Sequence, residues 1–347
     1  MLKSRDYWSG RMVELETRQL NKGVEFYHRL SEQYERAAAN IQKDIEAFYT
    51  RYATENKISL LEAKKQLKGR ELKEFRWAVE EYIEKGKTLN YSAKWAKELE
   101  RASIRYRVTR LEALKLQMQQ QVEALTGYEV DGIDKLARDI YEDGYYRTAF
   151  IVQKGYGVGS SFMRLDARKI DKIISAPYTA DGLNFSERIW GKHRPELLQK
   201  LNTDLVQMLI RGEDPRKLIN SIAKRFEVSK QQAGSLVMTE SAFFASASTR
   251  DSYNALGVKT FQVLATLDSD TCEDCGGREG VSIPMSDYVI GVTAPVFHPR
   301  CRCTTTIGLE DDDEPSYRVA RDKDGKRVEV PSNMTFAEWK KKFLVDA

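Results

Sequence analysis

The sequence predicts a mainly α-helical protein with long N-terminal helices, a helical middle region and a small α+β unit near its C-terminal end. Three observations support this fold class. No proline occurs in residues 1–130, helix start and stop signals become regular after Ser186, and an alternating run of β-branched and aromatic residues follows Gly257. At 347 residues the chain is long enough to form more than one domain. We divide it into residues 1–130, 131–257, 258–308 and 309–347.

Residues 1–130 form a basic region in which apolar side chains recur at helical spacing, as at Phe26, Leu30 and Tyr34. The net charge counted from the sequence is +5 over this region, +4 over residues 131–260 and −5 over the remainder. Two clusters of cations could contact DNA or an acidic partner, but the outer face of a helical bundle is the commoner explanation for such clusters. The cations concerned are Lys64, Lys65, Lys68, Arg101 and Arg105.

Residues 131–257 form the helical part of the next region. Asp214-Pro215 supplies an N-cap and a proline at the first helical position. Ser229 begins a capping box, which predicts that another helix starts there, and Gly257 predicts where that helix stops. Glu240 lies in an Ala- and Ser-rich part of this helix. The sequence leaves open whether its carboxylate is buried and hydrogen-bonded or exposed.

From Val258 onward the pattern is that of a strand, followed by a loop-rich segment with several glycines and prolines. The acidic run at residues 310–314 is expected to begin a solvated linker. A turn at residues 323–326 predicts a two-stranded hairpin, and a capping box at Thr335 predicts a last helix. The apolar side chains of that helix are expected to dock on a neighbouring domain or subunit; they are Phe336, Trp339, Phe343 and Leu344.

All four cysteines and one of the three histidines fall within residues 268–303. Two cysteines separated by two residues can both reach one tetrahedral metal ion from a single turn, so the segment is a candidate for a structural zinc site. The candidate ligands are Cys272, Cys275, His298, Cys301 and Cys303. We expect that not all five bind one ion, because Cys301 and Cys303 are expected to point to opposite faces of an extended segment. Reduced thiols that pack a small unit, or a redox pair, remain open alternatives.

The polar residues around the cysteines favour a structural role. Asp268 directly follows the predicted strand, where its carboxylate could accept hydrogen bonds from backbone amides of the cysteine turn or from Arg300 or Arg302. His298 as a general base with Cys301 as a nucleophile is the catalytic alternative, but the spacing gives no assurance that these two groups meet.

No run of about 18 apolar residues occurs, and the first residues lack the apolar core of a signal peptide. We therefore expect no membrane association and a cytoplasmic origin. Charged residues make up 31% of the chain, which is typical of extensive solvated helix surface.

Several motifs, taken in order, resemble the phage Mu F-like head morphogenesis family. They are Arg188-Ile-Trp-Gly, the helix from Ser229 to Glu240, Leu264 to Asp268, Thr271 to Cys275, His298-Pro-Arg-Cys-Arg302, and the stretch from Val330 to Trp339. The resemblance covers roughly residues 140–347. Asp268, His298, Cys301 and Arg302 match the frame typical of the family, and Glu240 lies in the helix before it. Many relatives lack the cysteine found here at position 272 or 275, so the resemblance does not make zinc a general requirement.

The resemblance implies a non-enzymatic virion protein, a minor head protein that acts beside the portal in procapsid assembly and DNA packaging or delivery. It implies contacts with portal, scaffold or major capsid protein, and with double-stranded DNA without sequence preference. The expected location is the head interior or portal vertex, after assembly in the host cytoplasm. The alternatives are a zinc-stabilised non-specific DNA-binding protein, or a head-associated enzyme or toxin. The last would need an added domain, and only 44 residues follow Cys303.

Overall fold

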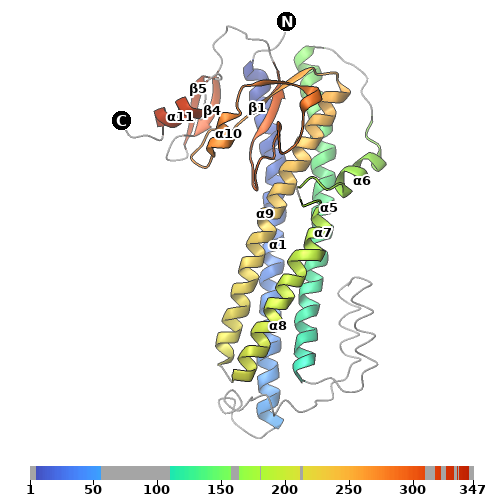
Figure 1. Ribbon diagram of the computed structural model, residues 1–347, viewed down its shortest axis with the longest axis vertical. Coiled ribbons are helices and arrows are strands. Elements are labelled where there is room, and N and C mark those ends of the chain that lie inside the picture. The colour runs from blue at the N-terminus through green and yellow to red at the C-terminus, as the bar shows by residue number, and fades with distance from the viewer. Residues whose placement is uncertain are drawn as a thin grey trace. The chain divides into compact units, whose positions relative to one another are not determined.

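The computed structural model describes residues 5–55, 110–157, 164–179, 181–211, 214–308, 317–321, 326–331, 334 and 336–343. It is mainly helical, as predicted (Figure 1). The long helices are α1 (Arg5–Glu55), α5 (Arg110–Tyr156), α8 (Arg194–Arg211) and α9 (Pro215–Ala255). The short ones are α6 (Ala167–Ser175), α7 (Phe185–Arg188), the π-helix η1 (Ile189–His193), α10 (Glu273–Gly277), the 3₁₀ turn η2 (Met285–Asp287) and α11 (Phe336–Phe343). The strands are β1 (Thr260–Leu264), β2 (Ser282–Pro284), β3 (Thr304–Ile307), β4 (Tyr317–Arg321) and β5 (Arg327–Pro331).

The long N-terminal helices are confirmed by α1, and the division at residue 130 falls inside α5. The predicted basic contacts Lys64, Lys65, Lys68, Arg101 and Arg105 lie outside the described residues. The chain forms two compact units, each assembled from separated stretches. Unit 1 comprises Met1–Phe26, Ile133–Tyr178 and Ser235–Ala347, and unit 2 comprises Tyr27–Gly132 and Thr179–Gly234.

The helical part of unit 1 depends on small side chains in α9. Its segment from Ser241 to Ser252 is almost entirely buried and consists largely of serine and alanine. Glycines on two other helices face these serines. A Cβ atom added at Gly144 of α5 would lie 2.2 Å from Ser248 Oγ, and one added at Gly23 of α1 would lie 2.4 Å from Ser241 Oγ. The helices therefore approach each other so closely that a side chain at either glycine would have to displace the facing serine.

The stop predicted at Gly257 is confirmed. Gly257 has φ +70°, a conformation that glycine adopts without a steric penalty. The Gly257 N–H donates to the carbonyl of Asn254 at 3.2 Å, and the Val258 N–H donates to the carbonyl of Tyr253 at 3.0 Å. These two bonds form a Schellman motif, which ends α9 and turns the chain toward β1.

The predicted small α+β unit is also confirmed. Strand β1 lies between β2 and β3 and is antiparallel to both. All four residues of β3 and the last four of β1 are buried, as expected for a central strand and a neighbour covered on both faces. The predicted hairpin is formed by β4 and β5, which pair from Tyr317 with Pro331 to Arg321 with Arg327.

The predicted last helix is α11, which begins one residue after Thr335. Its Trp339 is fully buried against Leu267, Ala320 and Val330 of the same chain. Leu267 belongs to the region 258–308, so the expectation that Trp339 docks on a neighbouring domain is borne out. The indole fills the space between the hairpin and the segment after β1, where an aromatic ring of this size gains much from full burial.

In unit 2, the helix start predicted at Ser229 is wrong. Helix α9 runs without interruption from Pro215, with Asp214 at its N-terminus accepting a hydrogen bond from the Arg216 N–H at 3.0 Å. Ser229 is buried in the middle of α9, and its hydroxyl donates to the Tyr34 hydroxyl at 3.5 Å. Tyr34 in turn donates to the buried Glu129 at 3.0 Å. The Ser229 hydroxyl, which the local motif predicted would cap a helix, is thus hydrogen-bonded to a residue distant in sequence.

Among the described residues, no helix is both long and apolar enough to cross a membrane.

The close helix contacts give a stability prediction. Gly144→Ala should lower the free energy of unfolding by about 1–3 kcal/mol, because the new methyl group must displace Ser248. Gly10→Ala is the matched control in unit 1, since its Cβ meets nothing within 4 Å. That change should stabilise the helix by roughly 0.5–1 kcal/mol. Chemical denaturation measures both, and equal stabilisation by the two changes would contradict the close contact.

Candidate functional site

Cys272 and Cys275 lie on a single tight turn. Cys272 is the N-cap of α10, with φ −75° and ψ 160°, and its Sγ accepts a hydrogen bond from the Cys275 N–H at 3.4 Å. The Gly276 N–H donates to the Cys272 carbonyl at 3.0 Å. Cys272 is exposed and Cys275 is buried. The turn therefore brings one sulfur to the surface and one to the interior.

His298 and Cys301 lie on a second turn of the same spacing. The Cys301 N–H donates to the His298 carbonyl at 3.1 Å. Arg300 within this turn has φ 61°, which is uncommon for a residue with a side chain. Its N–H donates to Thr239 Oγ1 of α9 at 3.1 Å, so the helix holds the turn in this conformation.

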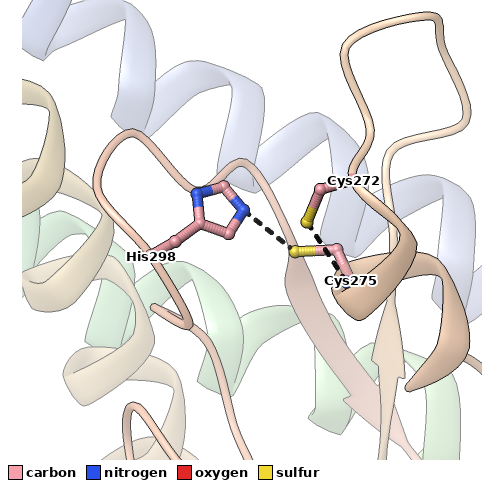
Figure 2. Close-up of side chains that lie close together, drawn as sticks. All are labelled: Cys272, Cys275 and His298. Carbon is pink, nitrogen blue, oxygen red and sulfur yellow. Dashed lines mark hydrogen bonds between the residues drawn. The ribbon is translucent and has the colours of Figure 1, made fainter.

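The ring of His298 is oriented by the backbone of the next residue. Its Nδ1 lies 2.9 Å from the carbonyl oxygen of Pro299. Because a carbonyl oxygen can only accept, we assign the ring proton to Nδ1. The lone pair of Nε2 then faces Cys275, whose Sγ lies 3.1 Å away (Figure 2).

The two turns meet at Cys275. Candidate ligand atoms of Cys272, Cys275 and His298 lie within 4.8 Å of one another, and the same holds for Cys275, Cys301 and Cys303. The structure therefore brings all five predicted residues into two groups that share Cys275. The expectation that Cys301 and Cys303 point to opposite faces is wrong, because residues two apart on an extended chain share a face. Both of these cysteines are buried.

Electrostatic effects in the buried group are unequal. Hydrogen bonds from Cys275 and Cys303 lower the pKa of the Cys301 thiol. The hydrogen bond with Cys301 raises the pKa of Cys275, and bonds to Cys275 and Cys301 raise that of Cys303. Among these three buried thiols, Cys301 is therefore the one most readily ionised.

Glu16 of α1, a buried neighbour of Cys301, was not predicted from the sequence. Burial and then the Cys301 charge raise the pKa of Glu16 to about 8. The carboxyl is accordingly neutral at pH 7. Its spacing of four residues from buried Met12 was a signal that it lies on the apolar face of α1.

The predicted structural role of Asp268 is supported by its contacts. Both nitrogens of the Arg302 fork donate to its carboxylate, one of them at 2.7 Å to Oδ1. The Thr271 hydroxyl and the Asp270 N–H each add a hydrogen bond of 3.1 Å to Oδ1. Burial opposes ionisation, but the interactions with Arg302 outweigh it and lower the pKa of Asp268. This pair joins the segment after β1 to the segment before β3.

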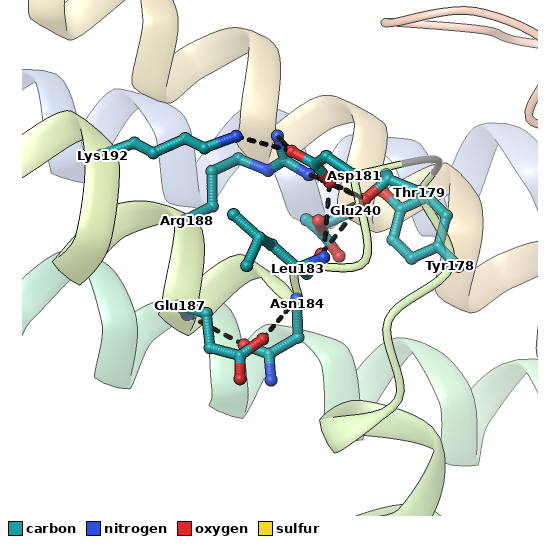
Figure 3. Close-up of polar contacts among 9 residues, drawn as sticks. All are labelled: Tyr178, Thr179, Asp181, Leu183, Asn184, Glu187, Arg188, Lys192 and Glu240. Carbon is teal, nitrogen blue, oxygen red and sulfur yellow. Dashed lines mark hydrogen bonds and ion pairs between the residues drawn. The ribbon is translucent and has the colours of Figure 1, made fainter.

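Glu240 is buried and hydrogen-bonded, which settles the alternative left open by the sequence. It is 3% exposed, and the Tyr178 hydroxyl donates to its Oε1 at 3.1 Å (Figure 3). The Tyr178 ring stacks on Phe243 with centroids 3.7 Å apart. Glu240 therefore fixes the segment after α6 against α9 within unit 1.

Asp181 lies near the start of the stretch Thr179–Gly234 of unit 2 and binds two cationic side chains there. This role was not predicted. Arg188 donates to both of its carboxylate oxygens at 2.8 Å, and Lys192 donates at 2.9 Å (Figure 3). Hydrogen bonds from Thr179, Lys192 and Arg188 lower the pKa of Asp181. The capping box formed by Asn184 and Glu187, visible in the sequence, was a signal that an ordered helix start lies here.

The Asp268–Arg302 pair gives a prediction with a pH dependence. Asp268→Asn should lower the free energy of unfolding at pH 7 by about 1–3 kcal/mol, because the charge-assisted bonds to Arg302 are lost. The folded-state pKa of Asp268 is depressed, so its stabilisation is present above the unfolded pKa of about 3.9. The difference between the wild type and the variant should shrink as the pH falls below that value.

The matched control for this variant is Asp270→Asn, two residues along the chain and exposed. It should change the stability by less than about 0.5 kcal/mol. Thermal denaturation over a pH series measures both variants. A loss for Asp268→Asn that does not change with pH would contradict the ion pair as its source.

Comparison with known families supports the resemblance. Residues 199–306 match the family model described as Phage Mu protein F like protein. Searches of the curated proteins and of the solved structures each give no match. The matched segment contains Glu240, Asp268, the four cysteines, His298 and Arg302, and is narrower than the resemblance estimated from the motifs. Residues 199–306 are therefore similar to the Phage Mu protein F like family, which bears out the resemblance to this phage head morphogenesis family over that segment.

Proposed function

We propose that this chain is a minor head protein of a tailed phage, acting beside the portal in procapsid assembly. The observation that carries the proposal is the family match over residues 199–306, which includes the whole frame from Glu240 to Arg302. The virion is the corresponding location, with the head interior or the portal vertex as the site of action.

The proposed mechanism is binding and assembly without bond chemistry. The contacts of the frame residues support this proposal, because they are directed toward other parts of the same chain. Asp268 pairs with Arg302, Glu240 accepts from Tyr178, and His298 lies between Pro299 and Cys275. Side chains arranged in this way stabilise a fold that presents its outer surface to partners.

The proposed partners are the portal protein, the scaffold or the major capsid protein. Double-stranded DNA is a further proposed partner, supported by the excess of positive charge in residues 1–260. Such contacts would be made mainly to phosphates and would not read the sequence of the DNA.

Co-assembly tests the role beside the portal. The chain is co-expressed with the portal, scaffold and major capsid proteins of its own phage, and particles are separated by sedimentation. We expect the chain to sediment with procapsids in a few copies per particle, and to be lost from particles made without the portal. Procapsids that exclude the chain would contradict the head role. Equal incorporation without the portal would contradict a portal contact and indicate that the chain binds the scaffold or the major capsid protein.

Salt dependence tests the DNA contact. The affinity for duplex DNA of arbitrary sequence should fall steeply between low and physiological salt, with a slope of about 0.9 per phosphate contacted. Neutralising Lys64, Lys65 and Lys68 to glutamine should reduce that slope. The charge-matched control neutralises the exposed residues Arg216, Lys217 and Lys224. An equal effect of the two triple variants would contradict the assignment to the first cluster, and no binding at low salt would remove DNA from the partners.

A further inference from the structure

We infer that the turns Cys272–Cys275 and His298–Cys301 together bind one zinc ion, with Cys272, Cys275, His298 and Cys301 as its four ligands. This inference stands on the geometry of unit 1 and does not depend on the role in head assembly.

The first argument is the repetition of one ligand spacing. Both pairs are separated by two residues, and each is closed by a hydrogen bond from the N–H of the second member. In the first turn that N–H donates to the sulfur of Cys272, and in the second it donates to the carbonyl of His298. Two tight turns of this kind, 22 residues apart between Cys275 and His298, are the usual means of building a small tetrahedral site.

The second argument is the separation of the ligand atoms. Bonds of about 2.3 Å to sulfur and about 2.0 Å to nitrogen, at tetrahedral angles, place neighbouring ligands roughly 3.5–3.8 Å apart. Cys275 Sγ lies 3.1 Å from His298 Nε2 and 4.0 Å from Cys301 Sγ. These two distances lie on either side of the required value. Cys301 Sγ lies outside the group formed by Cys272, Cys275 and His298, so its side chain must turn toward that group for the four atoms to share one ion.

The third argument is the orientation of the groups around the ligands. A histidine that binds a metal through Nε2 characteristically donates its Nδ1 proton to a carbonyl or carboxylate. His298 has this arrangement with the Pro299 carbonyl. The N–H of Cys275 donates to Cys272 Sγ, which orients that sulfur within the turn.

The ligand chemistry selects the ion. Three thiolates and one imidazole in a tetrahedral arrangement favour zinc over the hard cations calcium and magnesium, which take oxygen ligands. Thiols bind zinc as thiolates, so binding releases to solvent the thiol protons that the ligands still carry. Cys301 is chosen over Cys303 because it shares a turn with His298, so one backbone unit positions both ligands.

Metal titration of the full-length, tag-free chain tests the inference. The protein is purified under reducing conditions, stripped with a chelator, and titrated with cobalt(II) and then zinc. We expect about one ion per chain, with the visible bands of tetrahedral, thiolate-bound cobalt(II) that disappear when zinc displaces it. Zinc analysis of the untreated protein gives an independent count.

Variants identify the ligands. Cys272→Ser changes an exposed residue, so the fold should persist. Loss of a group that only hydrogen-bonds to a ligand costs roughly 10- to 100-fold in metal affinity, and loss of the ligand Cys272 itself should cost more. Cys303→Ser is the control and should retain the ion. Cys301→Ser should lower the zinc affinity as Cys272→Ser does, and His298→Gln provides a further test if Cys301→Ser does not fold. Circular dichroism confirms folding of each variant.

Three results would overturn the inference. The first is a wild-type chain that binds no cobalt(II) or zinc. The second is a disulfide between Cys275 and Cys301 in the protein isolated under native conditions. The third is an ion retained by Cys272→Ser or lost from Cys303→Ser, either of which rejects the proposed ligand set.

Discussion

The C-terminal part of unit 1 depends on the ion pair between Asp268 and Arg302. The carboxylate is almost fully buried, so it is stable there only because a fixed guanidinium fork and two further donors surround it. Asp268 follows β1, and Arg302 precedes β3, which pairs with β1. The Thr266 hydroxyl adds a bond to the Arg302 carbonyl at 2.9 Å. These bonds join the two ends of the segment from Asp268 to Arg302, and both cysteine-bearing turns lie within that segment.

Much of this architecture could be predicted because the determining signals are local. The Schellman end at Gly257, strand β1, the hairpin and α11 each follow from residues that are adjacent in sequence. The Asp268–Arg302 contact was also among the expected pairings. The return of the chain beside β1 as β3, which brings the two residues together, was not predicted.

The features that could not be predicted all depend on contacts between distant residues. Ser229 matches a capping box, but its hydroxyl is directed to Tyr34, and α9 continues through it. The close approach at Gly144 is decided by Ser248, more than one hundred residues away. At the candidate metal site, the five residues could be predicted from the sequence. That their turns meet at Cys275, and that Pro299 orients the His298 ring, could not.

The central claim is that the residues typical of the family act as a folding frame, with Asp268 and Arg302 as one energetic unit. A double-mutant cycle tests it most directly, using unfolding free energies of the wild type, Asp268→Asn, Arg302→Gln and the double variant. The account predicts that the double variant loses little more than either single one, with a coupling energy of about 1–3 kcal/mol at pH 7. Losses that add independently, with no coupling, would contradict it.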